Sequence, residues 1–192
     1  MLKNFSIDKN MAKLILFQRT ELLSNFQKKI RKIFGRYLFT NFMIEYFLNI
    51  KKNSKLLLLE KFINKTSSNS NIINYFELEE GSEVLHLVIQ NNINESNLQF
   101  TTHATCHQNS IFNQLIFNCS DTSLRNHHYA DLIGEHSEAN LKGIFFVGKK
   151  YINDNKTNIN HLNYGCSSNQ TYKGILTDNA KASYLSKTFV DK

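Results

Sequence analysis

The sequence predicts an all-β core preceded by a short amphipathic helix. From Tyr37 onward apolar and polar residues alternate with a period of two, which is the pattern of half-buried strands. Clusters of Asn, Ser, Gly and Asp separate the alternating segments, and the side chains of these residues favour turns. Segments begin about every ten to sixteen residues with no helical pattern between them, which disfavours a doubly wound α/β fold.

The first 36 residues follow a different pattern. Apolar residues recur there at steps of three and four between basic ones, which is typical of an amphipathic helix. We expect the helix to begin near Ile7 or Met11 and to end at Phe34, with Gly35 just after its last turn. Packing on this protein or on a partner is the usual reason for such a face, and binding to RNA or to a membrane surface is the alternative.

Eleven segments carry the strand pattern. They are Phe42–Ile50, Lys55–Ile63, Ile73–Leu78, Glu83–Gln90, Leu98–Cys106, Ile111–Cys119, Arg125–Leu132, Leu141–Val147, Thr157–Leu162, Gln170–Leu176 and Ala182–Val190. Their spacing fits a sandwich, a barrel or a coil of parallel rungs. The chain has no Pro and no Asn-Gly or Asp-Gly pair, and the absence of these hairpin turn pairs favours parallel coils.

The composition is that of a folded protein outside the membrane. Of its 192 residues, 41% are hydrophobic and 20% are charged, so one domain with a sizeable core is expected. No stretch approaches the ~18 consecutive apolar residues that a membrane span requires, and we find no signal peptide at the start of the chain. These features predict a cytoplasmic protein without a membrane partner.

The net charge of +7 is weak evidence for a nucleic-acid partner. Lys, Asn, Ile and Phe are abundant while Pro and Trp are absent, as in proteins encoded by A/T-rich genomes such as those of bacterial endosymbionts. The basic balance then follows from codon composition, and no nucleic-acid partner is expected.

Cysteine usage agrees with a reducing compartment. The chain has three thiols, Cys106, Cys119 and Cys166, and this odd number shows no disulfide pattern. Cys106 and Cys119 are expected to behave as buried hydrophobic residues. On a strand, His103 and His107 would share one face while Cys106 lies on the other, which favours structural histidines over a metal or haem site.

Residues 154 to 176 form the most distinctive segment of the chain. It carries Asp154, Thr157, His161, Cys166, Ser168, Gln170, Lys173 and Gly174. The segment resembles the signature of the SufB/SufD family, the scaffold subunits of the Suf iron–sulfur cluster assembly system, and SufD in particular. Earlier segments resemble the family in the same order: Lys55–Glu60, Leu78–Glu83, Leu124–His128 with Arg125, Leu132–Ala139 with Gly134 and Glu135, and Lys181–Ser186.

The resemblance runs from about residue 42 to residue 190, and it implies a fold and a function. The implied core is a partial, right-handed parallel β-helix over residues 42–192, after an N-terminal helical or irregular segment over residues 1–41. The implied function is that of a non-catalytic scaffold that pairs with a SufB-like subunit in a complex with the SufC ATPase. No cofactor is expected on this chain alone; a transient iron–sulfur cluster, and flavin as a further candidate, would belong to the complex.

The sequence also departs from the family. The family's Cys-x-His-Gly segment and C-terminal helical region have no counterpart here, and the second of these is what docks SufC. An internal piece of SufD is therefore expected, from a split, frameshifted or degraded gene. The unpaired backbone groups after Val190 predict instability or association of the isolated chain.

His161 and Cys166 are the candidate metal ligands. Imidazole and thiolate both bind iron, but a metal site needs three or four ligands and no further thiol lies nearby in the sequence. The alternative is that both residues pack and form hydrogen bonds at a corner of the β-helix, beside Ser168 and Gln170.

No catalytic residues are predicted. The chain has no Gly-x-Ser-x-Gly segment and no phosphate-binding loop, and the carboxylates of Glu135 and Glu138 fit a solvated turn. Three functions remain as alternatives to the scaffold: a non-functional remnant, a basic protein that binds RNA or a membrane surface through residues 1–36, and a β-helical carbohydrate-active enzyme. Few clustered acids and no export signal disfavour the last.

Overall fold

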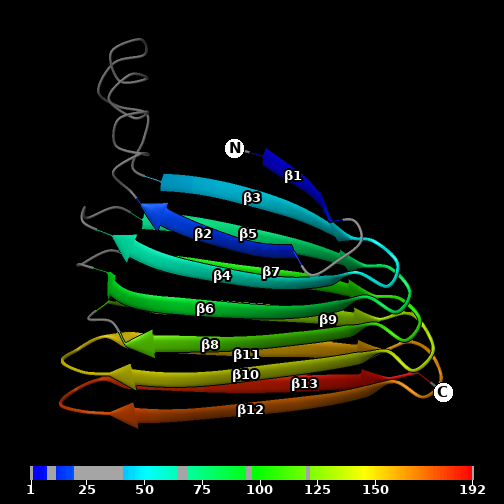
Figure 1. The fold of residues 1–192 in the computed structure, drawn as a ribbon. Helices are drawn as coiled ribbons and strands as arrows, with labels where there is room; N and C mark the ends of the chain where they lie inside the picture. Colours follow the sequence, from blue (N-terminus) through cyan, green and yellow to red (C-terminus); the bar gives the residue numbers. More distant parts are fainter. Residues whose placement is uncertain are drawn as a thin grey trace.

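The computed structural model describes residues 2–7, 12–19, 41–64, 69–93, 97–119 and 122–191. This part of the chain consists of strands and turns (Figure 1). The strands are β1 (Leu2–Ile7), β2 (Ala12–Arg19), β3 (Asn41–Ile50), β4 (Lys55–Asn64), β5 (Asn69–Leu78), β6 (Glu83–Ile93), β7 (Leu98–Cys106), β8 (Ile111–Cys119), β9 (Leu124–Leu132), β10 (Glu138–Val147), β11 (Ile152–His161), β12 (Ser167–Leu176) and β13 (Lys181–Val190).

The strands form two parallel sheets between which the chain alternates. The odd-numbered strands form a seven-stranded sheet in the order β1-β3-β5-β7-β9-β11-β13, and the even-numbered strands form a six-stranded sheet in the order β12-β10-β8-β6-β4-β2. Each turn of the coil therefore contributes one strand to each sheet, and the turns stack from the N-terminal to the C-terminal end (Figure 1). The predicted all-β fold and parallel β-helix are confirmed.

Successive turns from β3 onward stack in register. Paired residues lie 26 to 29 positions apart in the sequence, as with Leu98 beside Leu124 and Ile152 beside Lys181. All eleven predicted strands are present, and Leu98–Cys106 and Ile111–Cys119 have the predicted bounds. Others are longer, such as β5, which begins at Asn69. Its polar first residues suggest a turn in the sequence but pair with the neighbouring strands.

The prediction of an N-terminal helix is wrong for Ala12–Arg19, which forms β2. This strand pairs in parallel with β4, where Leu14 lies beside Leu58 and Leu16 beside Glu60. Residues 14–17 are all apolar, so the segment fits a strand as well as a helix, and pairing with a neighbouring strand decides between them. The rest of the predicted helix, residues 20–34, lies outside the described residues.

The space between the sheets is filled by the inward-facing side chains. The fully buried apolar residues include Leu48, Leu58, Leu78, Phe100, Phe112, Ile116, Leu132, Leu141 and Ile159. Polar and charged side chains are buried among them, namely Glu60, Asn74, His86, Gln90, Thr102, Gln114, Asn126, His128, Asn155 and Thr157. Burying a polar group is costly unless it is hydrogen-bonded. Several of these residues are paired across the core, as Asn74 is with Glu60 at 2.6 Å and Gln90 with Asn126 at 2.8 Å.

Candidate functional site

The turns that lead from the odd-numbered to the even-numbered sheet stack into a column. The residue before each even strand occupies the same place in every turn, because Lys55, Glu83, Ile111, Glu138 and Ser167 are in register. We call these stacked positions the serine column. It consists of Ser54, Ser82, Ser110, Ser137 and Cys166. The four serines are fully buried, so the column forms one edge of the core.

Three of the five turns are closed by the same side-chain hydrogen bond. The hydroxyl groups of Ser82, Ser110 and Ser137 donate to the carbonyl oxygen three residues earlier, at 2.6, 2.7 and 2.7 Å. The residue before each column position has a positive φ of between 55° and 69°; these residues are Asn53, Gly81, Asn109, His136 and Gly165. Asn and Gly favour this left-handed conformation, whereas His136 is less usual there.

Cys166 takes the place of a serine in the last turn of this column. Its thiol lies 3.4 Å from the Ser137 hydroxyl and 3.4 Å from the Gly134 carbonyl oxygen. The side chain is half-buried and packs against the hydrophobic core. The serine hydroxyls bond within their own turn, whereas the Cys166 thiol contacts groups of the preceding turn. Cys166 therefore occupies a serine position and joins two consecutive turns.

His161 lies at the end of β11, and its Nε2 is 2.9 Å from the Ser168 hydroxyl on β12. The imidazole thus spans the turn on which Cys166 lies, but it shares no hydrogen-bond partner with the thiol. The two residues stay candidates for metal binding. Within the described ranges, no group of three or more His, Cys, Asp and Glu side chains lies together as a metal site would require.

Gln170 is the centre of a polar network at the β12–β13 end of the coil. Its side-chain oxygen accepts hydrogen bonds from Thr157 and from Ser186, the second at 2.8 Å, and its amide nitrogen donates to Thr188 at 3.0 Å. Tyr184 lies 3.3 Å from the Thr157 hydroxyl. Three strands thereby contribute to one network, which fixes how β12 and β13 sit against each other.

The other residues of the distinctive segments lie elsewhere. Lys173 is exposed on the outward face of β12, beside Ile144 of β10. Arg125 is exposed on the outward face of β9, where its Nε lies 3.3 Å from a carboxylate oxygen of Asp154. Lys173 and Arg125 thus lie on the outward faces of different sheets. Thr157 contacts Gln170, and His161 contacts Ser168, between β11 and β12.

Gly134 and Glu135 belong to the turn before Ser137. A Cβ atom on Gly134 would lie 1.9 Å from the backbone nitrogen of Gln108, so no other residue fits without moving the neighbouring turn. The carbonyl group of Glu135 accepts a hydrogen bond from the Asn109 N–H at 2.9 Å. Both residues thus join consecutive turns of the coil, in agreement with a structural role.

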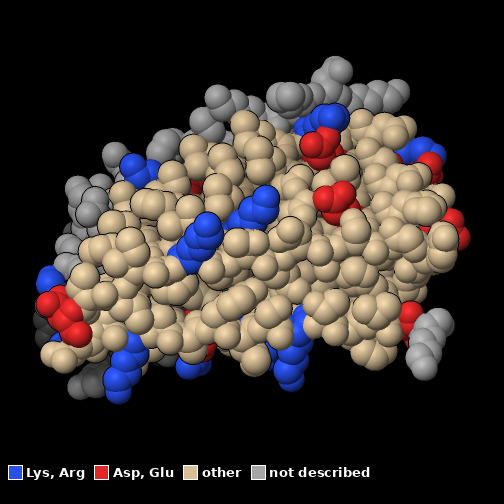
Figure 2. All heavy atoms as spheres, turned by 90° about the horizontal axis from the view of Figure 1, so that it is seen from below, with Lys and Arg blue, Asp and Glu red and all other residues tan. Residues whose placement is uncertain are grey.

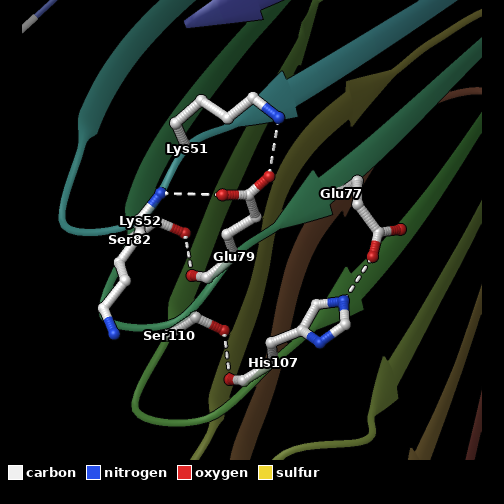
Figure 3. Close-up of polar contacts among 7 residues, drawn as sticks. All are labelled: Lys51, Lys52, Glu77, Glu79, Ser82, His107 and Ser110. Carbon is white, nitrogen blue, oxygen red and sulfur yellow. Dashed lines mark hydrogen bonds and ion pairs between the residues drawn. The ribbon is translucent and has the colours of Figure 1, made fainter. Parts of the chain in front are cut away.

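An ionic ladder runs along the outside of the same turns (Figure 3). Lys51 Nζ lies 2.8 Å from one carboxylate oxygen of Glu79, and the Lys52 N–H donates to the other at 3.0 Å. His107, which follows β7 in the next rung, contacts Glu77 near the end of β5. The hydrogen bond from Lys51, with further support from Lys52, lowers the pKa of Glu79 and keeps its carboxylate charged.

The residues around Cys106 lie as the strand alternation predicted. Cys106 is fully buried, and burial raises the pKa of its thiol to about 12. The His103 ring lies on the outward face, stacked between Tyr75 and Tyr129 at centroid distances of 5.2 and 4.7 Å. Cys106 is therefore a protonated core residue, and His103 is part of a ring stack. The expectation that Cys119 is buried is wrong, because this last residue of β8 lies on the outward face and is exposed.

A buried acid and two buried histidines were missed by the sequence reading. The Glu60 carboxylate accepts hydrogen bonds from Asn74 at 2.6 Å and from His86 Nε2 at 2.7 Å. The other ring nitrogen of His86 lies 3.1 Å from the Gln114 side-chain nitrogen, so both ring nitrogens have a partner in the core. Both Glu60 and His86 stand at positions where the alternation predicts an apolar side chain, and that mismatch is the signal that could have identified them.

His128 is the second buried histidine. Its side chain is 1% exposed, and neither of its ring nitrogens has a partner among the described residues. Burial lowers its pKa from 6.5 to about 3. His128 is therefore a neutral residue of the core in the folded protein.

The described residues include no helix with the length and apolar character required to cross a bilayer. A family model described as "SUF system FeS cluster assembly, SufBD core domain" matches residues 40–192. No curated protein and no solved structure matches the chain. The matched range contains every strand from β3 to β13.

Proposed function

The chain belongs to the SufBD core family of the SUF system, and we propose that it acts there as a non-catalytic, SufD-like scaffold subunit. Its role lies in iron–sulfur cluster assembly. The proposed partners are a SufB-like subunit and, in the same complex, the SufC ATPase. The single observation that carries the proposal is the family match over residues 40–192, on a chain that forms the β-helix implied by that match.

The arrangement of side chains supports a scaffold more than a catalyst. Several buried polar residues are hydrogen-bonded to one another, as Glu60 is to Asn74 and His86. The thiol of Cys106 is buried and protonated, and that of Cys166 is occupied in a turn. A chain that presents few free donors to iron fits a subunit that holds a partner in place, while the cluster is the cargo of the whole complex. On this proposal no cofactor resides on this chain alone, and any flavin belongs to the complex.

The β12–β13 end is the proposed contact with the SufB-like subunit. β12 pairs with β10 and β13 with β11, and no other strand of the described residues pairs with either. An open strand edge provides backbone N–H and C=O groups to which a partner can add a strand. Charged side chains on this end are scattered among uncharged ones (Figure 2).

The proposed complex is cytoplasmic. All three cysteines are free, as they would be in a reducing compartment. The proposal includes no nucleic acid and no membrane surface among the partners.

Co-purification of the tagged chain with SufB-like and SufC-like subunits from the same organism tests the proposal. We expect a defined complex. Leu176 is 47% exposed at a position in register with buried Val147, so a partner that continues the coil would cover it. Leu176→Asp should reduce recovery of the SufB-like subunit by about tenfold or more, because burying an unpaired carboxylate costs several kcal/mol.

The matched control is Ile152→Asp, at a residue that is 49% exposed on the outside of β11. It makes the same chemical change on another surface and should leave recovery unchanged. A folded chain that recovers neither subunit, or a Leu176→Asp variant that recovers both as well as the Ile152→Asp variant, contradicts the proposal.

A further inference from the structure

The outward face of the even-numbered sheet carries an apolar stripe. Its exposed members are Leu85 (41%), Leu115 (36%), Phe117 (45%), Ile144 (50%), Phe146 (45%) and Ile175 (62%). They come from four consecutive strands, and the strand register places several of them side by side, as with Phe117 beside Ile144 and Phe146 beside Ile175. Half-buried Ile89 lies next to Phe117 and extends the stripe towards β4. Contiguous exposed apolar surface of this kind marks an interaction site more often than a solvated face.

The opposite sheet shows that the stripe is not a general property of the coil. Its outward face carries polar and charged residues in the middle strands, among them Thr105, Arg125 and Asp131. Aromatic rings on that face stack on one another, as Phe47 does on Tyr75 at a centroid distance of 4.5 Å, and this covers much of their surface. Exposed apolar side chains also occur on that face, but Ile152, Leu185 and Phe189 each lie beside a polar residue of the paired strand, namely Lys181, Lys156 and Asn160. Of the two outward faces, the even-numbered sheet is therefore the one on which exposed apolar side chains lie beside one another.

The charges beside the stripe are mostly positive. Lys61 lies beside Ile89, Lys142 beside Leu115 and Lys173 beside Ile144, and none of these lysines has an acceptor within the described part of the chain. Glu83 lies 2.5 Å from Lys55, so those two charges pair with each other. Glu138, at the start of β10, accepts a hydrogen bond from the uncharged Asn140 amide at 2.6 Å. The face thus has three lysines beside the stripe and one carboxylate at its margin.

We propose that this face binds a protein segment that presents apolar side chains flanked by carboxylates. The apolar stripe would provide most of the contact, at roughly 25 cal/mol per Å² of surface removed from water. Carboxylates at the rim of the partner would pair with Lys61, Lys142 and Lys173 and set its orientation. The site lies on the outward face of the even-numbered sheet and ends on β12, whereas the proposed SufB-like contact uses the open edges and inward-facing side chains of β12 and β13. The argument for the site does not depend on the proposed function.

Two other occupants fit the face less well. A second copy of this chain would bring a surface with the same excess of lysines, because each copy sets one carboxylate, Glu138, against three lysines. A lysine side chain is longer than a leucine or isoleucine side chain, so the ammonium groups extend farther from the sheet than the apolar groups. A membrane needs the opposite order, with the apolar groups deepest. A protein segment can provide carboxylates that pair with the lysines and apolar side chains that reach the stripe between them.

A photo-crosslinking experiment on the full chain in its own cells tests the proposal. Ile144 is replaced with benzoylphenylalanine, and the matched control is the same replacement of Ile152, which has nearly the same exposure on the other sheet. We expect a crosslinked peptide at position 144 that contains Asp or Glu close to apolar residues and is absent at position 152. The peptide is identified by mass spectrometry.

Charge reversal then tests the role of the lysines. The combined K61E, K142E and K173E substitutions should weaken the crosslink by about tenfold or more, whereas the combined K150E, K181E and K187E substitutions make the same change in net charge elsewhere and should leave it intact. Circular dichroism checks that both variants are folded.

If the triple variant does not fold, a synthetic copy of the crosslinked peptide is titrated against Ile144→Ser and Ile152→Ser, and only the first should lose binding. A crosslink to lipid, to nucleic acid or to a second copy of the chain, equal labelling at 144 and 152, or a crosslink that survives charge reversal would overturn the proposal.

Discussion

His128 shows how strongly the fold controls the chemistry of a single residue. An exposed histidine titrates near pH 6.5, but burial between the two sheets lowers the pKa of His128 to about 3. The nearby His86, His127 and His103 act in the same direction. The imidazole is therefore neutral in the folded protein at every pH near neutrality, while the unfolded chain still takes up a proton.

The stability of the protein should consequently fall in acid. Below about pH 6.5 the unfolded chain binds a proton at His128 that the folded chain does not bind until about pH 3. The contribution of neutral His128 is thus complete above pH 6.5, and the free energy of unfolding decreases by up to about 1.4 kcal/mol per pH unit below it. Denaturant unfolding of wild type and His128→Leu between pH 7 and pH 4 measures this slope.

The His128→Leu variant should show a shallower pH dependence than the wild type. The control is His136→Asn, because His136 is exposed and asparagine occupies the same left-handed turn position at Asn53 and Asn109. It should keep the wild-type slope. Equal slopes for wild type and His128→Leu would show that His128 is not responsible for the acid sensitivity.

At the scale of the element, the turns explain the most distinctive cysteine of the sequence. Sequence spacing places Cys166 five residues after His161 and suggests a pair of ligands. Register instead places Cys166 in the serine column beneath Ser137, with its thiol directed at Gly134 and Ser137. The column is visible only once the rungs are aligned, because its members lie 27 to 29 residues apart in the chain.

Cys166→Ser should therefore be tolerated. Serine already fills the equivalent place in four other turns, so the free energy of unfolding is expected to change by less than about 1 kcal/mol. Recovery of the proposed partner subunits should also be unchanged. Denaturant unfolding and co-purification check both expectations, with Cys119→Ser at an exposed thiol as the control. A folded Cys166→Ser variant that no longer supports cluster assembly would instead identify the thiol as a ligand.

At the scale of the whole molecule, the coil is held together by contacts between neighbouring rungs. Each inner strand is paired on both sides, whereas β12 and β13 each pair on one side within the described residues. The inward-facing residues of these two strands are also more exposed than those of β7 to β9. In such a quasi-one-dimensional structure, stability depends on the number of neighbours a rung has.

Native-state hydrogen exchange should reveal this gradient. The backbone amides of β7, β8 and β9 are expected to exchange slowest, and those of β12 and β13 markedly faster. Adding the SufB-like subunit should slow exchange in β12 and β13 and leave the central strands unchanged, which serve as the internal control. Uniform protection along the coil, or no change at the β12–β13 end in the recovered complex, would contradict this picture.

The sequence by itself determined the period-two strands, their approximate bounds from β3 to β13 and the family to which the chain belongs. These features are local, because alternation and turn residues act over a few positions. Only the tertiary structure decided that Ala12–Arg19 is a strand, since its apolar run suits either period and pairing with β4 settles it.

Tertiary structure also decided which distant residues meet. Glu60 contacts His86 of the next rung, and Cys166 is aligned with four serines. Both results depend on strand register, which is set by the lengths of all the strands and turns between the residues and cannot be read from one short segment. In the same register Gln170 lies on the inward face of β12 and Lys173, three residues later, on the outward face. Alternation predicts that these two residues lie on opposite faces, but only the pairing of the sheets shows that one face is the core and the other is an apolar surface open to a partner.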